Sequence, residues 1–202
     1  MPPQQRSSAL ATRAAGLAAD GFRVFPLQSN GKRPITDHGL FDASDDVERV
    51  ADWWRWHPEA NVGIRTGDGL LVVDIDCKAA DGEQSWQELL DAHNGGEPLI
   101  TRVVLTPHAG RHLYFQLPDG VVVGNTATGT PRALAPGIDT RADGGYAVAA
   151  GVIDGKAYDT ISEPVAPAPP WLVELLGERD GDAQRSRKPR PRSTRARGAT
   201  RT

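Results

Sequence analysis

The stretch Gly-Leu-Leu-Val-Val-Asp-Ile-Asp-Cys at residues 69–77 decides the fold. Its apolar run is short and follows the turn-prone Gly67-Asp68-Gly69, which favours a buried strand over a helix. Side chains alternate along a strand, so Asp74 and Asp76 are expected on one face and Ile75 on the other. The sequence therefore predicts two carboxylates side by side at the end of a buried strand.

Two neighbouring carboxylates repel each other and are costly to remove from water. A divalent cation removes both penalties, and Mg²⁺ or Mn²⁺ favours carboxylates together with water and phosphate oxygens. The alternative is that Asp74 and Asp76 lie in solvent or cap the following turn. The pattern by itself leaves both interpretations open.

The composition suits one loop-rich α/β domain, expected over residues 1–178, with 39% hydrophobic residues, 22 Gly and 16 Pro in a chain of 202. Residues 179–202 are expected to form a disordered basic tail. Residues 184–202 contain eight Lys/Arg and no acid, so the first 183 residues carry a formal charge of −11. The tail is expected either to bind nucleic acid or only to aid solubility; its basic residues are Arg185, Arg187, Lys188, Arg190, Arg192, Arg195, Arg197 and Arg201.

A single cysteine, Cys77, excludes an internal disulfide and a multi-cysteine zinc site. No apolar run reaches the length of a membrane span, and the first residues lack the apolar core of a signal peptide. We therefore expect a soluble, cytoplasmic protein without a membrane partner.

Hydrophobic periodicity and turn residues predict alternating helices and strands. The expected helices cover residues 7–19, 42–56 (with Ser44 as N-cap), 82–93 and 171–176. The expected strands cover residues 22–27, 61–65, 101–106, 112–117, 136–141, 144–150 and 157–161, with 101–117 and 136–150 read as hairpins.

Several polar residues have both a structural and a functional interpretation. Lys32 and Arg33 lie in a turn that is either a solvated tip or a phosphate or template contact. Trp53 and Trp54 have the spacing of a helix core, although tryptophans can also stack on bases. His112 begins a strand, where a lone histidine is usually structural; the neighbouring Arg111 favours a functional role.

The order of motifs resembles the N-terminal domain of the bifunctional DNA primase/polymerases, the prim-pol branch of the archaeo-eukaryotic primase superfamily. The likeness covers about residues 10–176 and rests on order and spacing. The motifs are Gly31-Lys32-Arg33-Pro34, Trp53-Trp54, Asn61-Val62-Gly63-Ile64, the two aspartates of 74–76, Gly110-Arg111-His112, Gly137-Ile138-Asp139, Arg141, Gly144-Gly145-Tyr146 and Trp171-Leu172.

The resemblance implies a role for each matching residue. Asp74, Asp76 and Asp139 would hold two catalytic Mg²⁺ or Mn²⁺ ions, and His112 would contact the phosphates of the incoming nucleotide, with Arg111 as a helper. Lys32, Arg33 and Arg141 are further candidates for phosphate or template contacts. Two metal ions would lower the pKa of a 3′-hydroxyl and stabilise the leaving pyrophosphate, while cationic side chains would neutralise the triphosphate.

The implied function is a metal-dependent nucleotidyltransferase that makes or extends primers on a DNA template from NTPs or dNTPs. The resemblance also implies a separate helicase as a partner and a mobile genetic element as the biological setting. His108 and Ala109 stand where the family usually has Ser-Gly, which supports a first alternative, a catalytically weak DNA-binding module for replication initiation. A metal-dependent phosphodiesterase or nuclease is the second alternative, because the same acids could activate water.

The expected fold is a two-layer α+β domain. A central mixed or antiparallel sheet would carry the acids and His112 on its open face, with helices on the other face. The resemblance adds an RRM-like catalytic half and an N-terminal αβ unit.

Overall fold

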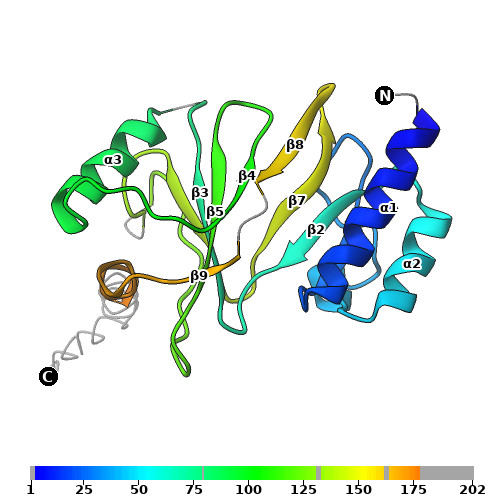
Figure 1. The fold of residues 1–202 in the computed structure, drawn as a ribbon, viewed down its shortest axis with the longest axis horizontal. Helices are drawn as coiled ribbons and strands as arrows, with labels where there is room; N and C mark the ends of the chain where they lie inside the picture. The colour runs from blue at the N-terminus through cyan, green and yellow to red at the C-terminus, as the bar shows by residue number, and fades with distance from the viewer. Residues whose placement is uncertain (1–2, 79, 131–132, 162–163, 178–202) are drawn as a thin grey trace, which may run out of the picture.

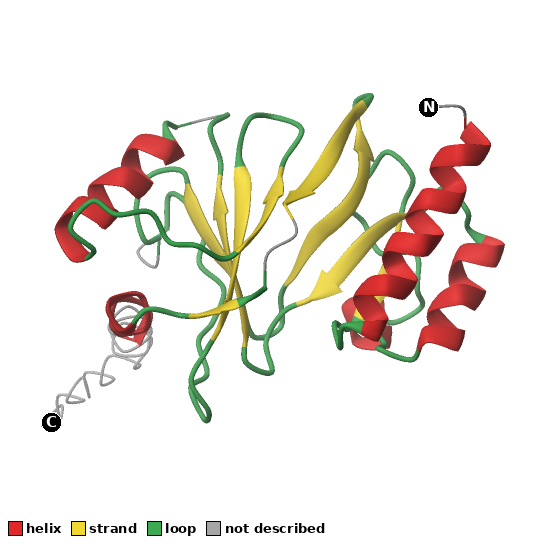
Figure 2. Cartoon of the chain, in the orientation of Figure 1, coloured by secondary structure: helices red, strands yellow, loops and turns green. Residues whose placement is uncertain are grey.

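The computed structural model describes residues 3–78, 80–130, 133–161 and 164–177, and its elements follow the expected alternation (Figures 1 and 2). Helical segments are α1 (Pro3–Ala19), the 3₁₀ turn η1 (Gly39–Asp42), α2 (Val47–Trp56), α3 (Gly82–His93) and residues 170–177. Strands are β1 (Val24–Leu27), β2 (Asn61–Arg65), β3 (Leu70–Ile75), β4 (Arg102–Leu105), β5 (Arg111–Gln116), β6 (Ile138–Arg141), β7 (Tyr146–Ile153), β8 (Lys156–Ile161) and β9 (Ala166–Pro167).

The described strands form one curled sheet in the order β1-β2-β7-β8-β4-β5-β3-β6. Every neighbouring pair in this order is antiparallel, and β9 adds a short parallel pairing to β5. The fold is therefore α+β, as expected. No helix of the described chain is long and apolar enough to cross a membrane.

The expectation that helices cover only one face of the sheet is wrong. Leu17 of α1 packs in one core with Val72 and Tyr114, whereas Trp86 of α3 packs in a second core with Val73. Val72 and Val73 are neighbours on β3, so their side chains point to opposite faces. Figure 1 shows α1 and α2 on one side of the sheet and α3 on the other. Helices α1 and α2 pack against β1, β2 and β7, whereas α3 packs against β3 and β6 from the other side.

Two local predictions are also wrong. The strands at residues 138–141 and 146–153 do not pair as a hairpin: β6 pairs with β3, whereas β7 pairs with β2 and β8. The second helix begins at Val47, because Asp46 caps it by accepting hydrogen bonds from the backbone of Glu48 and Arg49. Ser44 instead forms a bridge with β1 at Val24. In both cases, pairing between segments that are far apart in the sequence determines the local structure.

The end of β3 is enclosed by three glycines that approach its backbone closely. A Cβ at Gly110 would lie 2.3 Å from the carbonyl oxygen of Ile75. A Cβ at Gly82 or Gly137 would lie 2.6 or 2.8 Å from the carbonyl oxygen of Asp76. These distances are too short for any side chain, so glycine allows α3 and the turns before β5 and β6 to pack against this strand end.

Candidate active site

Strand pairing brings three sequence-predicted side chains together on one face of the sheet. Asp74 on β3 is the direct partner of His112 on β5 and of Asp139 on β6. Directly opposed residues point to the same face, with Cβ atoms about 5 Å apart. Arg141 joins this group, because it lies two residues after Asp139 on the same strand.

Arg141 bridges the two aspartates. Its Nη2 lies 3.1 Å from Oδ2 of Asp139 and 3.7 Å from Oδ2 of Asp74. On the other side, Nε2 of His112 lies 3.4 Å from Oδ1 of Asp74. The site is therefore an alternation of cationic and anionic groups, arranged as His112, Asp74, Arg141 and Asp139.

Cationic neighbours keep Asp74 ionised despite its burial. Burial by itself raises the pKa of Asp74, but the hydrogen bond and charge of His112, followed by the charges of Arg141 and Lys32, outweigh it and lower the pKa below its ordinary value. Asp139 is fixed differently: Thr128 donates to its Oδ1 through the backbone N–H and the hydroxyl group. Both carboxylates are therefore fixed in position by neighbouring groups.

A cavity of about 340 Å³ opens beside this group, a size typical of small-molecule sites. Lys32 lines it together with Asp74, His112 and Arg141, although Lys32 comes from the distant turn after β1. The hydroxyl of Tyr146 donates to the backbone oxygen of Lys32 at 3.0 Å, which links this turn to β7. The functional interpretation of Lys32 thus gains a geometric basis.

Sequence reasoning missed Tyr158, which lines the same cavity from β8. Its ring centroid lies 6.0 Å from that of His112, and burial, with a smaller effect of the Asp74 charge, raises the pKa of Tyr158 to about 12. Nδ1 of His112 is buried and has no hydrogen-bond partner among the described residues. No sequence motif around Tyr158 indicates a functional role, because β8 reaches the site only through its pairing with β4 and β7.

The remaining predicted site residues lie outside this group. Asp76 is exposed beyond the end of β3, where its carboxylate accepts from the backbone N–H of Lys78. Arg111 lies on the opposite face of β5 and forms an ion pair with Glu83 of α3. Arg33 is exposed and does not line the cavity. The tail residues Arg185, Arg187, Lys188, Arg190 and Arg192 lie outside the described residues.

The expected set of three carboxylates is not assembled here. Across the described chain, no group of three or more His, Cys, Asp or Glu side chains is arranged to hold a metal ion. Asp74 and Asp139 alone still fit Mg²⁺ or Mn²⁺, because such ions are often held by one or two carboxylates plus waters and substrate phosphates. The donor chemistry of the site is therefore compatible with a divalent cation.

A comparison with protein families decides the affiliation. The model for the bifunctional DNA primase/polymerase N-terminal domain matches residues 14–171. The chain belongs to this family. The match to this prim-pol domain includes β3, β5 and β6 in full, the strands that carry Asp74, His112 and Asp139. A comparison with curated proteins gives no match.

Proposed function

We propose that this prim-pol domain is a metal-dependent nucleotidyltransferase that makes or extends primers on a DNA template. The observation that carries the proposal is the grouping of Asp74, Asp139, His112 and Arg141 beside a cavity of nucleotide-compatible size. Family membership supports a primase or polymerase activity.

Each residue has a definite role in this proposal. Asp74 and Asp139 hold Mg²⁺ or Mn²⁺. Asp76, whose Oδ1 accepts from the backbone N–H of Lys78, can join them only if its side chain moves, because the three acids are not grouped here. When bound, the divalent cation lowers the pKa of the attacking 3′-hydroxyl and offsets the charge of the pyrophosphate.

The cations of the site contact the triphosphate. Lys32 and Arg141 line the cavity from opposite segments of the chain, so they can neutralise phosphates on two sides of a bound nucleotide. His112 can donate to a phosphate oxygen from its Nε2 when this atom turns away from Asp74, and Tyr158 packs at a tilt beside the ring of His112. Arg111 has no part in this arrangement, because its ion pair with Glu83 lies on the other face.

The sheet around the site supports the RRM-like interpretation of the catalytic half. In chain order, β3, α3, β4, β5 and β6 follow one another, and their strands lie side by side as β4-β5-β3-β6. A four-stranded sheet that presents functional side chains on one face is the platform of RRM domains. The segment from α1 to β2 then corresponds to the N-terminal αβ unit.

The decisive experiment is incorporation of labelled NTPs and dNTPs on primed and unprimed single-stranded DNA, with Mn²⁺ or Mg²⁺. The double variant Asp74→Ala/Asp76→Ala should abolish incorporation, because it removes a metal ligand and its neighbour. Asp91→Ala is the matched control, since Asp91 is exposed on α3, across the sheet from the cavity. Product in the primer-free lane would demonstrate priming.

The alternatives predict different outcomes. DNA binding without incorporation in any lane would favour the DNA-binding module for replication initiation. Degradation of DNA without added nucleotides, lost in the double variant, would favour a phosphodiesterase or nuclease. Incorporation that survives the double variant would refute the proposed role of these aspartates.

A further inference from the structure

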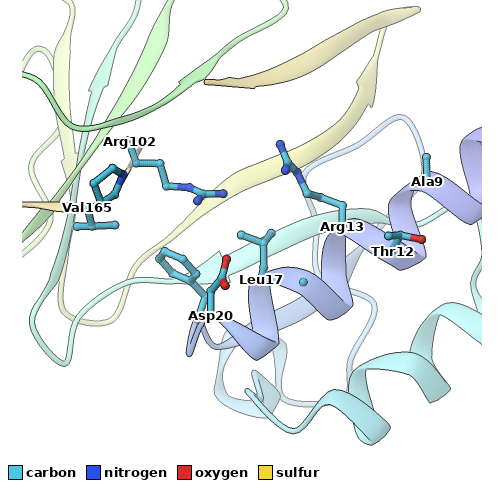
Figure 3. Close-up of a pocket in the computed structure, with 10 residues that line it drawn as sticks. Ala9, Thr12, Arg13, Leu17, Asp20, Arg102 and Val165 are labelled. Carbon is cyan, nitrogen blue, oxygen red and sulfur yellow. The ribbon is translucent and has the colours of Figure 1, made fainter. Parts of the chain in front are cut away.

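A second cavity, of about 940 Å³, lies between α1 and the start of β4 (Figure 3). Arg13, Leu17 and Asp20 line it from α1 and the residue after it, and Arg102 lines it from β4. None of its lining residues belongs to the cavity beside Asp74. It is therefore a separate site, not an extension of the candidate active site.

Arg102 is the unusual residue of this cavity. It is only 8% exposed, and its Nε has no hydrogen-bond partner among the described residues. Its guanidinium lies 5.2 Å from the centre of the Phe22 ring, a cation–π contact that uses none of the N–H groups as hydrogen-bond donors. Burial lowers the pKa of Arg102, so its charge is not fully compensated. Burying a cation without an anionic partner is costly.

A second arginine faces it. Figure 3 shows the side chain of Arg13 reaching from α1 and that of Arg102 reaching from the sheet into the same space, with the carboxylate of Asp20 nearby. No ion pair within 4.0 Å joins either arginine to a described residue, and the charge of Arg13 itself disfavours the charged form of Arg102. Two cations thus converge against one carboxylate, which leaves an excess positive charge.

Apart from Thr12, the other residues of the wall are apolar. Leu17 is buried, while Phe22 and Val165 are half-buried beside the arginines. A cavity of this size that combines an apolar wall with convergent polar groups is typical of a small-molecule site. Arginine pairs suit phosphate, because the planar guanidinium donates two parallel hydrogen bonds to its oxygens.

We propose that this cavity binds a nucleoside phosphate, with the phosphate between Arg13 and Arg102 and the nucleoside against Leu17, Phe22 and Val165. Asp20 accepts a hydrogen bond from a hydroxyl or amino group of the ligand. The inference does not depend on the proposed polymerase activity, since it concerns different residues on a different wall of the molecule.

Isothermal titration calorimetry of the full chain in EDTA tests the proposal, with AMP, inorganic phosphate and a five-nucleotide oligothymidylate as probes. AMP or the oligonucleotide should bind more tightly than inorganic phosphate, and Arg102→Gln should weaken that binding at least tenfold. Binding of AMP identifies a free nucleotide as the ligand, whereas binding of the oligonucleotide alone identifies a nucleic-acid strand.

Three further variants make the result specific. Arg13→Gln should also weaken binding, and it tests the site from a half-buried helix position if Arg102→Gln does not fold. Arg49→Gln, which removes an arginine stacked on Trp53 of α2, should leave binding unchanged. Arg55→Gln, which removes an exposed arginine of α2 paired with Asp52, should also leave it unchanged. No binding of any probe, or equal binding by both cavity variants and wild type, would overturn the proposal.

Discussion

Arg141 contacts two carboxylates at once, and this makes its role testable at the scale of one residue. The ion pairs with Asp139 and Asp74, at 3.1 and 3.7 Å, involve the two carboxylates that are proposed to hold a divalent cation. Two unit charges at such distances interact by roughly 4 to 5 kcal/mol at an effective dielectric constant of 20. The 34% exposure of Arg141 reduces this value through solvent screening.

We therefore predict that Arg141→Gln binds Mn²⁺ about tenfold more tightly but incorporates nucleotides more slowly. The metal gains carboxylates freed from a competing cation, whereas the nucleotide loses a phosphate contact. Calorimetric titration of Mn²⁺ measures the first effect and the incorporation assay measures the second. Arg49→Gln serves as a control with the same charge change on α2. Weaker Mn²⁺ binding by Arg141→Gln would contradict the proposed competition.

At the scale of elements, the end of β3 depends on Gly110, the glycine that ends the turn before β5. We predict that Gly110→Ala lowers the free energy of unfolding by roughly 2 kcal/mol, because the new Cβ would clash with the carbonyl oxygen of Ile75 at 2.3 Å. Gly16→Ala is the control: its Cβ would enter open space within α1, so it should stabilise by about 0.5 to 1 kcal/mol. Chemical denaturation of both variants measures the free energy of unfolding. Changes of the same sign in the two variants would refute the packing argument.

The neighbouring turn residue is strained for a different reason. Ala109 has a positive φ of 63°, a conformation that costs an L-residue about 1 kcal/mol relative to glycine. Ala109→Gly should therefore raise the melting temperature. Ala51→Gly, at an exposed position of α2, should lower it, because glycine weakens a helix interior. A loss of stability in Ala109→Gly would show that the alanine methyl group makes compensating contacts.

At the scale of the whole molecule, the sequence divides into an acidic part and a basic end. Removal of residues 183–202 deletes eight Lys/Arg and no acid. If this end holds the template, truncation should weaken binding to single-stranded DNA and reduce the slope of log K against log salt by up to about 5 to 6 units, or about 0.7 per cation. A fluorescence-anisotropy salt series measures this slope. Identical slopes for both chains would exclude the tail from DNA binding.

The whole-molecule arrangement also explains which sequence-based predictions succeed. Alternation along a single strand correctly predicts that Asp74 and Ile75 of β3 point to opposite faces, because Asp74 lines the cavity whereas Ile75 lies in the core with Trp86. The helical spacing of apolar residues likewise predicts the bounds of α3 at residues 82–93. These features depend on how apolar residues are spaced along a short segment, and this spacing can be read from neighbouring residues alone.

The sequence by itself therefore determined the succession of helices and strands, the family, and which residues could share a face within one strand. Only the tertiary structure decided that Asp74 lies between His112 and Asp139, that Arg141 reaches both acids, and that Arg111 pairs with Glu83 instead. The physical reason is strand register: pairing between segments tens of residues apart depends on the packing of both faces of the sheet. A slip of one residue would reverse every side chain, and no local pattern records that choice.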